Sequence, residues 1–223
     1  MYTYAFLKTP ATPLELPIGI DRLVQVVSRD ELAAVVEPDL ILDELKDDKI
    51  LMQAVLCHDR VIRELFLQTT ILPLRFGTSF LSLQGLLTHL EANRSTYLEK
   101  LTQFEGKAEY PLKFIPLPLP EAPVSLEAKG KDYFLAKKQQ YQMQLERQRQ
   151  QQNEFKRMAL IVTQAYPQFV TSETQAEVET VYLLAKREEE PQLHQAFREW
   201  QNQCPSWQMT LGEALPPYHF MGD

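Results

Sequence analysis

The chain has 223 residues, of which 44% are apolar, so it is long and apolar enough to bury one large or two small cores. Its formal net charge of −7 gives no overall basic field, which disfavours nucleic-acid partners that are held by neutralising many phosphates. No run of about eighteen apolar residues occurs, and no basic segment followed by an apolar stretch opens the chain, so we expect neither a membrane span nor secretion.

The first half of the sequence predicts an antiparallel sheet with two helices. Tyr2 to Leu7 alternate and are rich in aromatic residues, which is typical of a strand. Apolar spacing predicts the other elements of this half: a hairpin over 23–27 and 32–36, a helix over 43–66, a strand over 71–76, a helix over 82–104 and a strand over 108–115. We expect both helices to cover one face of the sheet, as in a variant of the ferredoxin-like plan.

Closely spaced prolines end this half of the chain, at positions 111, 116, 118, 120 and 123. Prolines lack amide donors and favour a stiff, extended connection. The sequence therefore predicts an α+β protein with two domains, 1–118 and 131–223, joined by a Pro-rich linker over 119–130. The second domain is expected to be a small α+β domain with these elements: a long helix over about 131–166, a strand over 176–186, a helix over 191–203, a strand over 207–211 and a tail over 216–220 that folds back.

Five short motifs stand out by their order along the chain. His58 precedes the segment Leu72–Thr78, which joins an apolar run, an arginine and a glycine turn. The other three are the Tyr-rich start Tyr2–Leu7, the segment Gly130–Tyr133 that opens the long helix, and the closing segment Pro216–Phe220. In this order they resemble the gas vesicle protein F/L family (GvpF/GvpL), and the resemblance touches both ends and the middle of the chain.

The resemblance implies a function that the residues alone do not give. Members of that family are accessory or minor structural proteins needed to form gas vesicles, the gas-filled protein shells that give aquatic microbes buoyancy. They are thought to contact the small hydrophobic shell protein A. The resemblance thus implies a cytosolic protein of the gas vesicle, with this shell protein and other gas vesicle accessory proteins as partners. The residues themselves indicate no enzyme, no cofactor, no nucleic-acid partner and no lipid membrane.

The sequence shows no assembled catalytic or metal-binding set. His58 and Asp59 are adjacent on a predicted helix and point about 100° apart, so they do not form the usual pair of a base and its orienting carboxylate. We expect His58 to pack beside the strand that carries Arg75. Cys57 and Cys204 lack the paired spacing of metal ligands or of a disulfide framework, and we expect reduced, structural thiols.

Arg75 is the polar residue that the sequence singles out. An arginine inside an apolar strand must find a carboxylate or several carbonyls, so we expect Arg75 to be half-buried and paired, with ligand contact as the alternative. Gly77 and Thr78 hint at an anion-binding turn, although one glycine does not make a phosphate loop. The basic residues of the long helix, at 137, 138, 147 and 149, suit a helix that braces two domains or contacts a partner.

Recognition of an apolar shell subunit requires exposed apolar side chains or an unpaired sheet edge. The candidates are aromatic residues of the opening strand and of the tail: Tyr2, Tyr4, Phe6, Tyr218 and Phe220. Ordinary core packing is the alternative for each of them. The competing function is a small-molecule enzyme or sensor that uses a cleft between the two domains, with Arg75 and His58 as anion-binding or acid–base groups.

Overall fold

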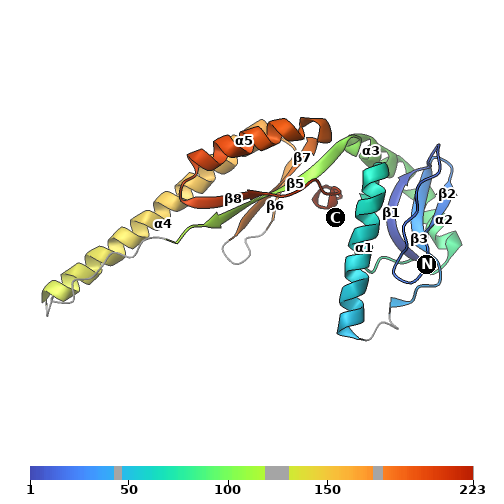
Figure 1. The fold of residues 1–223 in the computed structure, drawn as a ribbon, viewed down its shortest axis with the longest axis horizontal. Helices are drawn as coiled ribbons and strands as arrows, with labels where there is room; N and C mark the ends of the chain where they lie inside the picture. Colours follow the sequence, from blue (N-terminus) through green and yellow to red (C-terminus); the bar gives the residue numbers. More distant parts are fainter. Residues whose placement is uncertain (43–46, 119–130, 173–177, 223) are drawn as a thin grey trace. The chain divides into compact units, whose positions relative to one another are not determined.

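The structure, a computed structural model, forms two compact units (Figure 1). It describes residues 1–42, 47–118, 131–172 and 178–222. The first unit contains Met1–Glu109 and the tail from Ala214, and the second contains Tyr110–Glu213. The chain therefore crosses between the units twice.

This division differs from the predicted domains 1–118 and 131–223. The strand Lys107–Pro116 spans the first crossing, at Glu109–Tyr110. The tail from Ala214 belongs to the first unit, not to the second. The predicted linker over 119–130 lies outside the described residues, so it stays a prediction.

The first unit is built on a four-stranded antiparallel sheet with the strand order β2-β3-β1-β4. Its strands are β1 (Tyr2–Lys8), β2 (Gln25–Arg29), β3 (Leu32–Glu37) and β4 (Ile71–Pro73). All of β3, and all of β1 except its last residue, are buried. A strand that is covered on both faces reads as a near-continuous apolar run, as the five residues Leu32–Val36 do.

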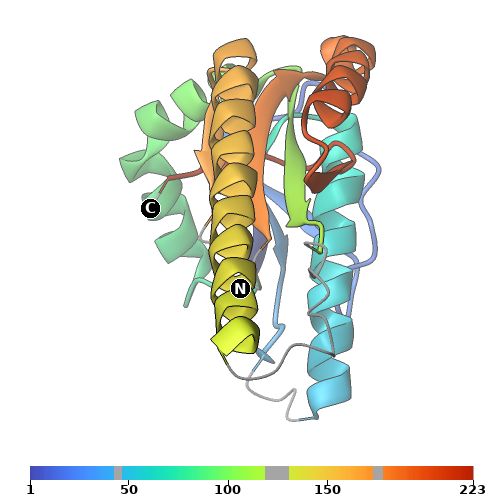
Figure 2. The same cartoon turned by 90° about the vertical axis from the view of Figure 1, so that its left-hand side faces the viewer.

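Helices cover both faces of this sheet, so the expectation that they share one face is wrong. The helices are α1 (Asp48–Gln68), α2 (Leu83–Ala92) and α3 (Arg94–Phe104), and the single helix predicted over 82–104 is α2 and α3. Figure 2 shows α1 on one side of the strands and the other two helices on the opposite side. The pairing of β1 with β3 shifts register between Thr3 and Ala5, and this bulge turns Phe6 to the face opposite Tyr4. Tyr4 accordingly packs on α1, whereas Phe6 packs on α2 and α3.

The second unit has its own four-stranded sheet with the order β6-β7-β5-β8. Its elements are β5 (Lys107–Pro116), α4 (Lys131–Ala165), β6 (Phe169–Thr171), β7 (Glu179–Lys186), the 3-10 helix η2 (Arg187–Glu189), α5 (Glu190–Gln203) and β8 (Trp207–Leu211). The strand predicted over 108–115 pairs with β8 and so belongs to this sheet, not to the first one. On α4, Phe155 packs against Phe114 and Trp207 of the sheet.

The two sheets and the helices of both units confirm the predicted α+β class with a long helix. Among the described residues, no helix is both long enough and apolar enough to cross a bilayer.

Candidate functional site

His58 contacts residues of two other motifs, Tyr2 and Leu74, and is 4% exposed. Its Nδ1 lies 2.7 Å from the Tyr2 hydroxyl, and its Nε2 lies 3.0 Å from the carbonyl oxygen of Leu74. Because a carbonyl only accepts, Nε2 carries the proton, and Nδ1 accepts from the Tyr2 hydroxyl. Burial lowers the pKa of His58, so the ring is neutral at neutral pH. We call these three groups the His58 network, and both ring nitrogens are occupied within it.

The segment Arg75–Thr78 is a turn that follows β4. The backbone N–H and the hydroxyl of Thr78 both donate to the carbonyl of Arg75, at 3.1 and 2.7 Å. Gly77 has a φ of 92°, which glycine adopts without strain and which the third position of such a turn requires. Phe76 packs edge-on against the two rings of the His58 network. The motif therefore has a structural role, because its turn is anchored on buried aromatic rings.

Arg75 itself is exposed, so the expectation of a half-buried, paired arginine is wrong. β4 ends at Pro73, which leaves Arg75 in the turn instead of in the apolar strand. Within the described residues, its guanidinium group makes no ion pair and no hydrogen bond. Among the described residues, the Arg75 side chain thus makes no contact that holds the fold.

Replacing Arg75 by alanine is expected to change the free energy of unfolding by less than about 0.5 kcal/mol, because an exposed side chain without partners adds little. Urea unfolding of the purified variant measures this. Arg60 is the matched control, since it is also exposed but donates to the Ile18 carbonyl, to Glu64 and to Cys57. Arg60→Ala is expected to cost about 1 kcal/mol. A loss of about 3–5 kcal/mol for Arg75→Ala would instead indicate a buried pair.

Glu37 is a fully buried carboxylate that the sequence analysis did not single out. It accepts hydrogen bonds from the backbone N–H groups of Ile20–Arg22, at 2.6 to 2.8 Å, and from the Tyr4 hydroxyl at 2.5 Å. Burial, together with this carboxylate, raises the pKa of Tyr4 far above its usual range, so the hydroxyl remains a donor. The ring of Tyr4 stacks on His58, which joins the carboxylate to the His58 network. The sequence did contain a signal for this buried carboxylate, because Glu37 follows directly on the apolar run Leu32–Val36.

The aromatic candidates divide into two groups. Tyr2, Tyr4 and Phe6 lie in the core of the first unit, so core packing holds for them and they are not exposed contacts. Tyr218 and Phe220 are half-buried in the tail, in the 3-10 helix η3 (Tyr218–Phe220). These two therefore keep part of their surface free.

The tail is fastened to the first unit by polar contacts. The backbone N–H of His219 and its ring Nδ1 both contact the Glu109 carboxylate, at 2.9 and 2.7 Å. Lys100 donates to the carbonyl of Met221. Glu109 is 1% exposed, and burial raises its pKa despite the opposing effect of His219. The closing motif thus folds back onto the unit that contains the opening strand.

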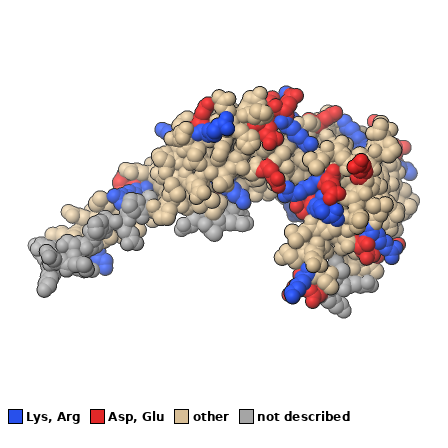
Figure 3. All heavy atoms as spheres, viewed as in Figure 1, with Lys and Arg blue, Asp and Glu red and all other residues tan. Residues whose placement is uncertain are grey.

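Exposed apolar side chains gather on the first half of α1. No charged residue occurs from Ile50 to His58. The exposed apolar members are Ile50, Leu51, Met52, Val55 and Leu56, which we call the α1 patch. In Figure 3 the surface over this part of the helix is mostly uncharged. The periodicity of the predicted helix places Ile50, Leu51 and Val55 on its apolar side, yet the sheet does not bury them, so they form a surface.

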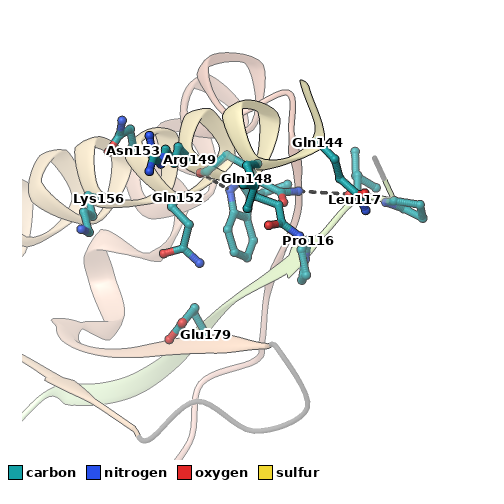
Figure 4. Close-up of a pocket in the computed structure, with 13 residues that line it drawn as sticks. Pro116, Leu117, Gln144, Gln148, Arg149, Gln152, Asn153, Lys156 and Glu179 are labelled. Carbon is teal, nitrogen blue, oxygen red and sulfur yellow. Dashed lines mark hydrogen bonds between the residues drawn. The ribbon is translucent and has the colours of Figure 1, made fainter. Parts of the chain in front are cut away.

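A separate pocket of about 1010 Å³ lies in the second unit, beside α4 (Figure 4). Amide side chains of α4 dominate its lining, and they are Gln144, Gln148, Gln151, Gln152 and Asn153. Gln151 donates to the carbonyls of Leu117 and Ser206, so it braces the wall. None of the candidate site residues from the sequence lines this pocket, although Pro116, Pro118 and Arg149 do. In the described part of the chain, no group of three or more His, Cys, Asp or Glu side chains could hold a metal ion.

Comparison with known proteins gives two kinds of match. The family model "Gas vesicle synthesis protein GvpL/GvpF" matches residues 1–222. The crystal structure of gas vesicle protein GvpF from Microcystis aeruginosa is 16% identical, with a TM-score of 0.72 over 99% of this chain and 98% of that one. The crystal structure of GvpF from Anabaena sp. PCC7120 is 14% identical, with a TM-score of 0.71 over 100% and 95%. No curated protein sequence matches. The two structures support the fold, and the family match spans nearly the whole chain.

Proposed function

We propose that this chain, which belongs to the GvpL/GvpF family of gas vesicle synthesis proteins, binds the small hydrophobic shell protein A through the α1 patch. Membership of the family gives the chain a role in gas vesicle formation. The proposal adds the partner, the surface that meets it and a site of action in the cytoplasm, where the shell grows. Other gas vesicle accessory proteins are further partners under the same proposal.

The observation that carries the proposal is the exposure of the α1 patch. Met52 and Leu56 are 61% and 63% exposed. Burying such side chains against a partner contributes about 1.5–3 kcal/mol each, so two or three of them supply a substantial part of a binding energy. A hydrophobic shell subunit offers the apolar surface that this contact needs, and no deep pocket is required.

The competing function, a small-molecule enzyme or sensor, would use His58 and Arg75 together. Both nitrogens of His58 are bonded inside the core, whereas Arg75 is exposed on a turn. Because His58 is buried with both nitrogens bonded while Arg75 is exposed, their placement favours a binding protein over an acid–base site.

The proposal is tested with the double variant Met52→Ser, Leu56→Ser and purified shell protein. We expect the dissociation constant to rise at least about tenfold, because two apolar contacts are lost. The matched control is the double variant Leu67→Ser, Leu81→Ser, which changes two exposed leucines outside the α1 patch. The control variant should bind as the unchanged protein does, and circular dichroism should show the native fold for both.

A second arm separates the α1 patch from the tail. Tyr218→Ser with Phe220→Ser removes the half-buried aromatic residues of η3. Binding lost in this folded variant but kept in the Met52, Leu56 variant would transfer the contact to the tail. Equal binding by all variants would refute an apolar contact at either surface.

A further inference from the structure

A groove of about 470 Å³ lies in the first unit, between α1 and the loops that precede it. Its lining residues are Ile20, Asp21, Asp39, Leu40, Ile41, Ile50, Gln53, Ala54 and Cys57. Four of them are large aliphatic side chains, and the only charged ones are the two aspartates. The groove therefore combines aliphatic and polar surface, and its charged side chains are both acidic.

The two carboxylates of the groove lie close to one cation. Arg22 Nε lies 3.3 Å from Asp21, and its Nη1 lies 4.0 Å from Asp39. Two negative charges thus face a single guanidinium group, which leaves this part of the groove negative. Asp39 is 82% exposed and has a φ of 62°, a conformation that aspartate and asparagine tolerate better than most residues. Both carboxylates are accessible to a second cation.

The chain itself carries a segment with the complementary character, in the first half of α4. From Phe134 to Gln150 no side chain is buried. Phe134, Tyr141 and Leu145 fall on one stripe of this helix, since they are seven and four residues apart. Lys138 lies on the same stripe. From Phe134 to Gln150 the helix has four basic residues and one acidic residue.

We propose that the first half of α4 of one copy docks into the groove of a second copy. Aromatic and aliphatic side chains at helical spacing meet the aliphatic side chains of the groove, and Lys138 meets its two aspartates, as in recognition of an amphipathic helix. Because the two surfaces differ, the contact is heterologous and leads to rings or open chains of copies.

The groove and the α1 patch share Ile50, but the residues changed to test the two contacts are different. Met52 and Leu56, the residues changed to test that binding, do not line the groove. The two aspartates of the groove, in turn, do not belong to the α1 patch. Each of the two contacts can therefore fail without the other.

A charge exchange tests the proposal with the full-length chain. Asp21→Lys places a cation against Lys138, and Lys138→Glu places an anion against the two aspartates, so each variant alone should self-associate on the order of tenfold more weakly than the unchanged protein. An equimolar mixture restores an opposite-charge pair at every contact. We therefore expect the mixture to recover association, measured by sedimentation velocity at low salt up to about 1 mM protein.

A pair of matched aspartates supplies the control. Asp30 and Asp39 have positive φ angles of 53° and 62°, and both are exposed. Of the two, only Asp39 lines the groove. Asp39→Asn should weaken association, whereas Asp30→Asn should leave it unchanged. The proposal is overturned if the unchanged protein stays monomeric over the whole concentration range, or if the mixture fails to recover association while circular dichroism shows every variant folded.

Discussion

Replacing Glu37 by alanine is expected to lower the free energy of unfolding by about 3–5 kcal/mol. The carboxylate is fully buried and accepts four hydrogen bonds, three of them from the backbone of Ile20–Arg22. Without it, the N–H groups of Asp21 and Arg22 and the hydroxyl of Tyr4 lose their acceptor, whereas the N–H of Ile20 keeps the Tyr4 oxygen at 3.0 Å; unpaired donors at a buried site are costly. Gly19 lies so close to the carboxylate that a Cβ there would overlap it, so the loop is packed directly against Glu37.

Urea unfolding followed by far-UV circular dichroism measures this loss. Fluorescence is the poorer probe here, because Trp200 and Trp207 both lie in the second unit. Glu91→Ala is the control, since Glu91 is an exposed glutamate that pairs with Arg29, and it should cost less than about 1 kcal/mol. Equal midpoints for the Glu37 and Glu91 variants would show that the buried carboxylate does not hold the loop.

The periodicity of the sequence predicted the elements better than their arrangement. A strand over Tyr2–Leu7 and a long helix beyond the prolines follow from local patterns, and both are present. Which residues of the opening strand face each side of the first sheet depends on a bulge between Thr3 and Ala5. The spacing of residues in the sequence does not indicate this bulge. The apolar run Leu32–Val36 did indicate a sheet that is covered on both faces, because in a strand that faces water on one side apolar and polar residues alternate.

The sequence indicated which residues of the candidate site lie together, but not the role of Arg75. His58 and the turn at Gly77 lie together, as their shared motif implied, since the turn packs on the rings of the His58 network. Arg75 was placed wrongly because the strand ends two residues earlier, at Pro73, and the end of an element is the least certain part of a pattern. The α1 patch was missed because helical spacing shows which residues are apolar, not how much of the helix the sheet can cover.

Stability is expected to fall with acidification below about pH 6.5, because His58 is buried and neutral. Burial lowers its pKa in the folded chain, whereas the unfolded chain keeps the ordinary value. Above pH 6.5 the ring is neutral in both states, so its contribution is complete. Between that value and the lowered pKa only the unfolded chain takes up the proton, and stability falls by up to about 1.4 kcal/mol per pH unit.

His58→Gln isolates this effect, because an amide can still accept from the Tyr2 hydroxyl and donate to the Leu74 carbonyl but does not titrate. Two other groups contribute to the raw curve: burial also lowers the pKa of His89, and the raised pKa of Glu109 acts in the opposite direction. The quantity to compare is therefore the difference in unfolding free energy between variant and unchanged protein from pH 7.5 to 5, which should shrink as pH falls. A constant difference for His58→Gln over this range would mean that the ring takes up its proton without opening the core.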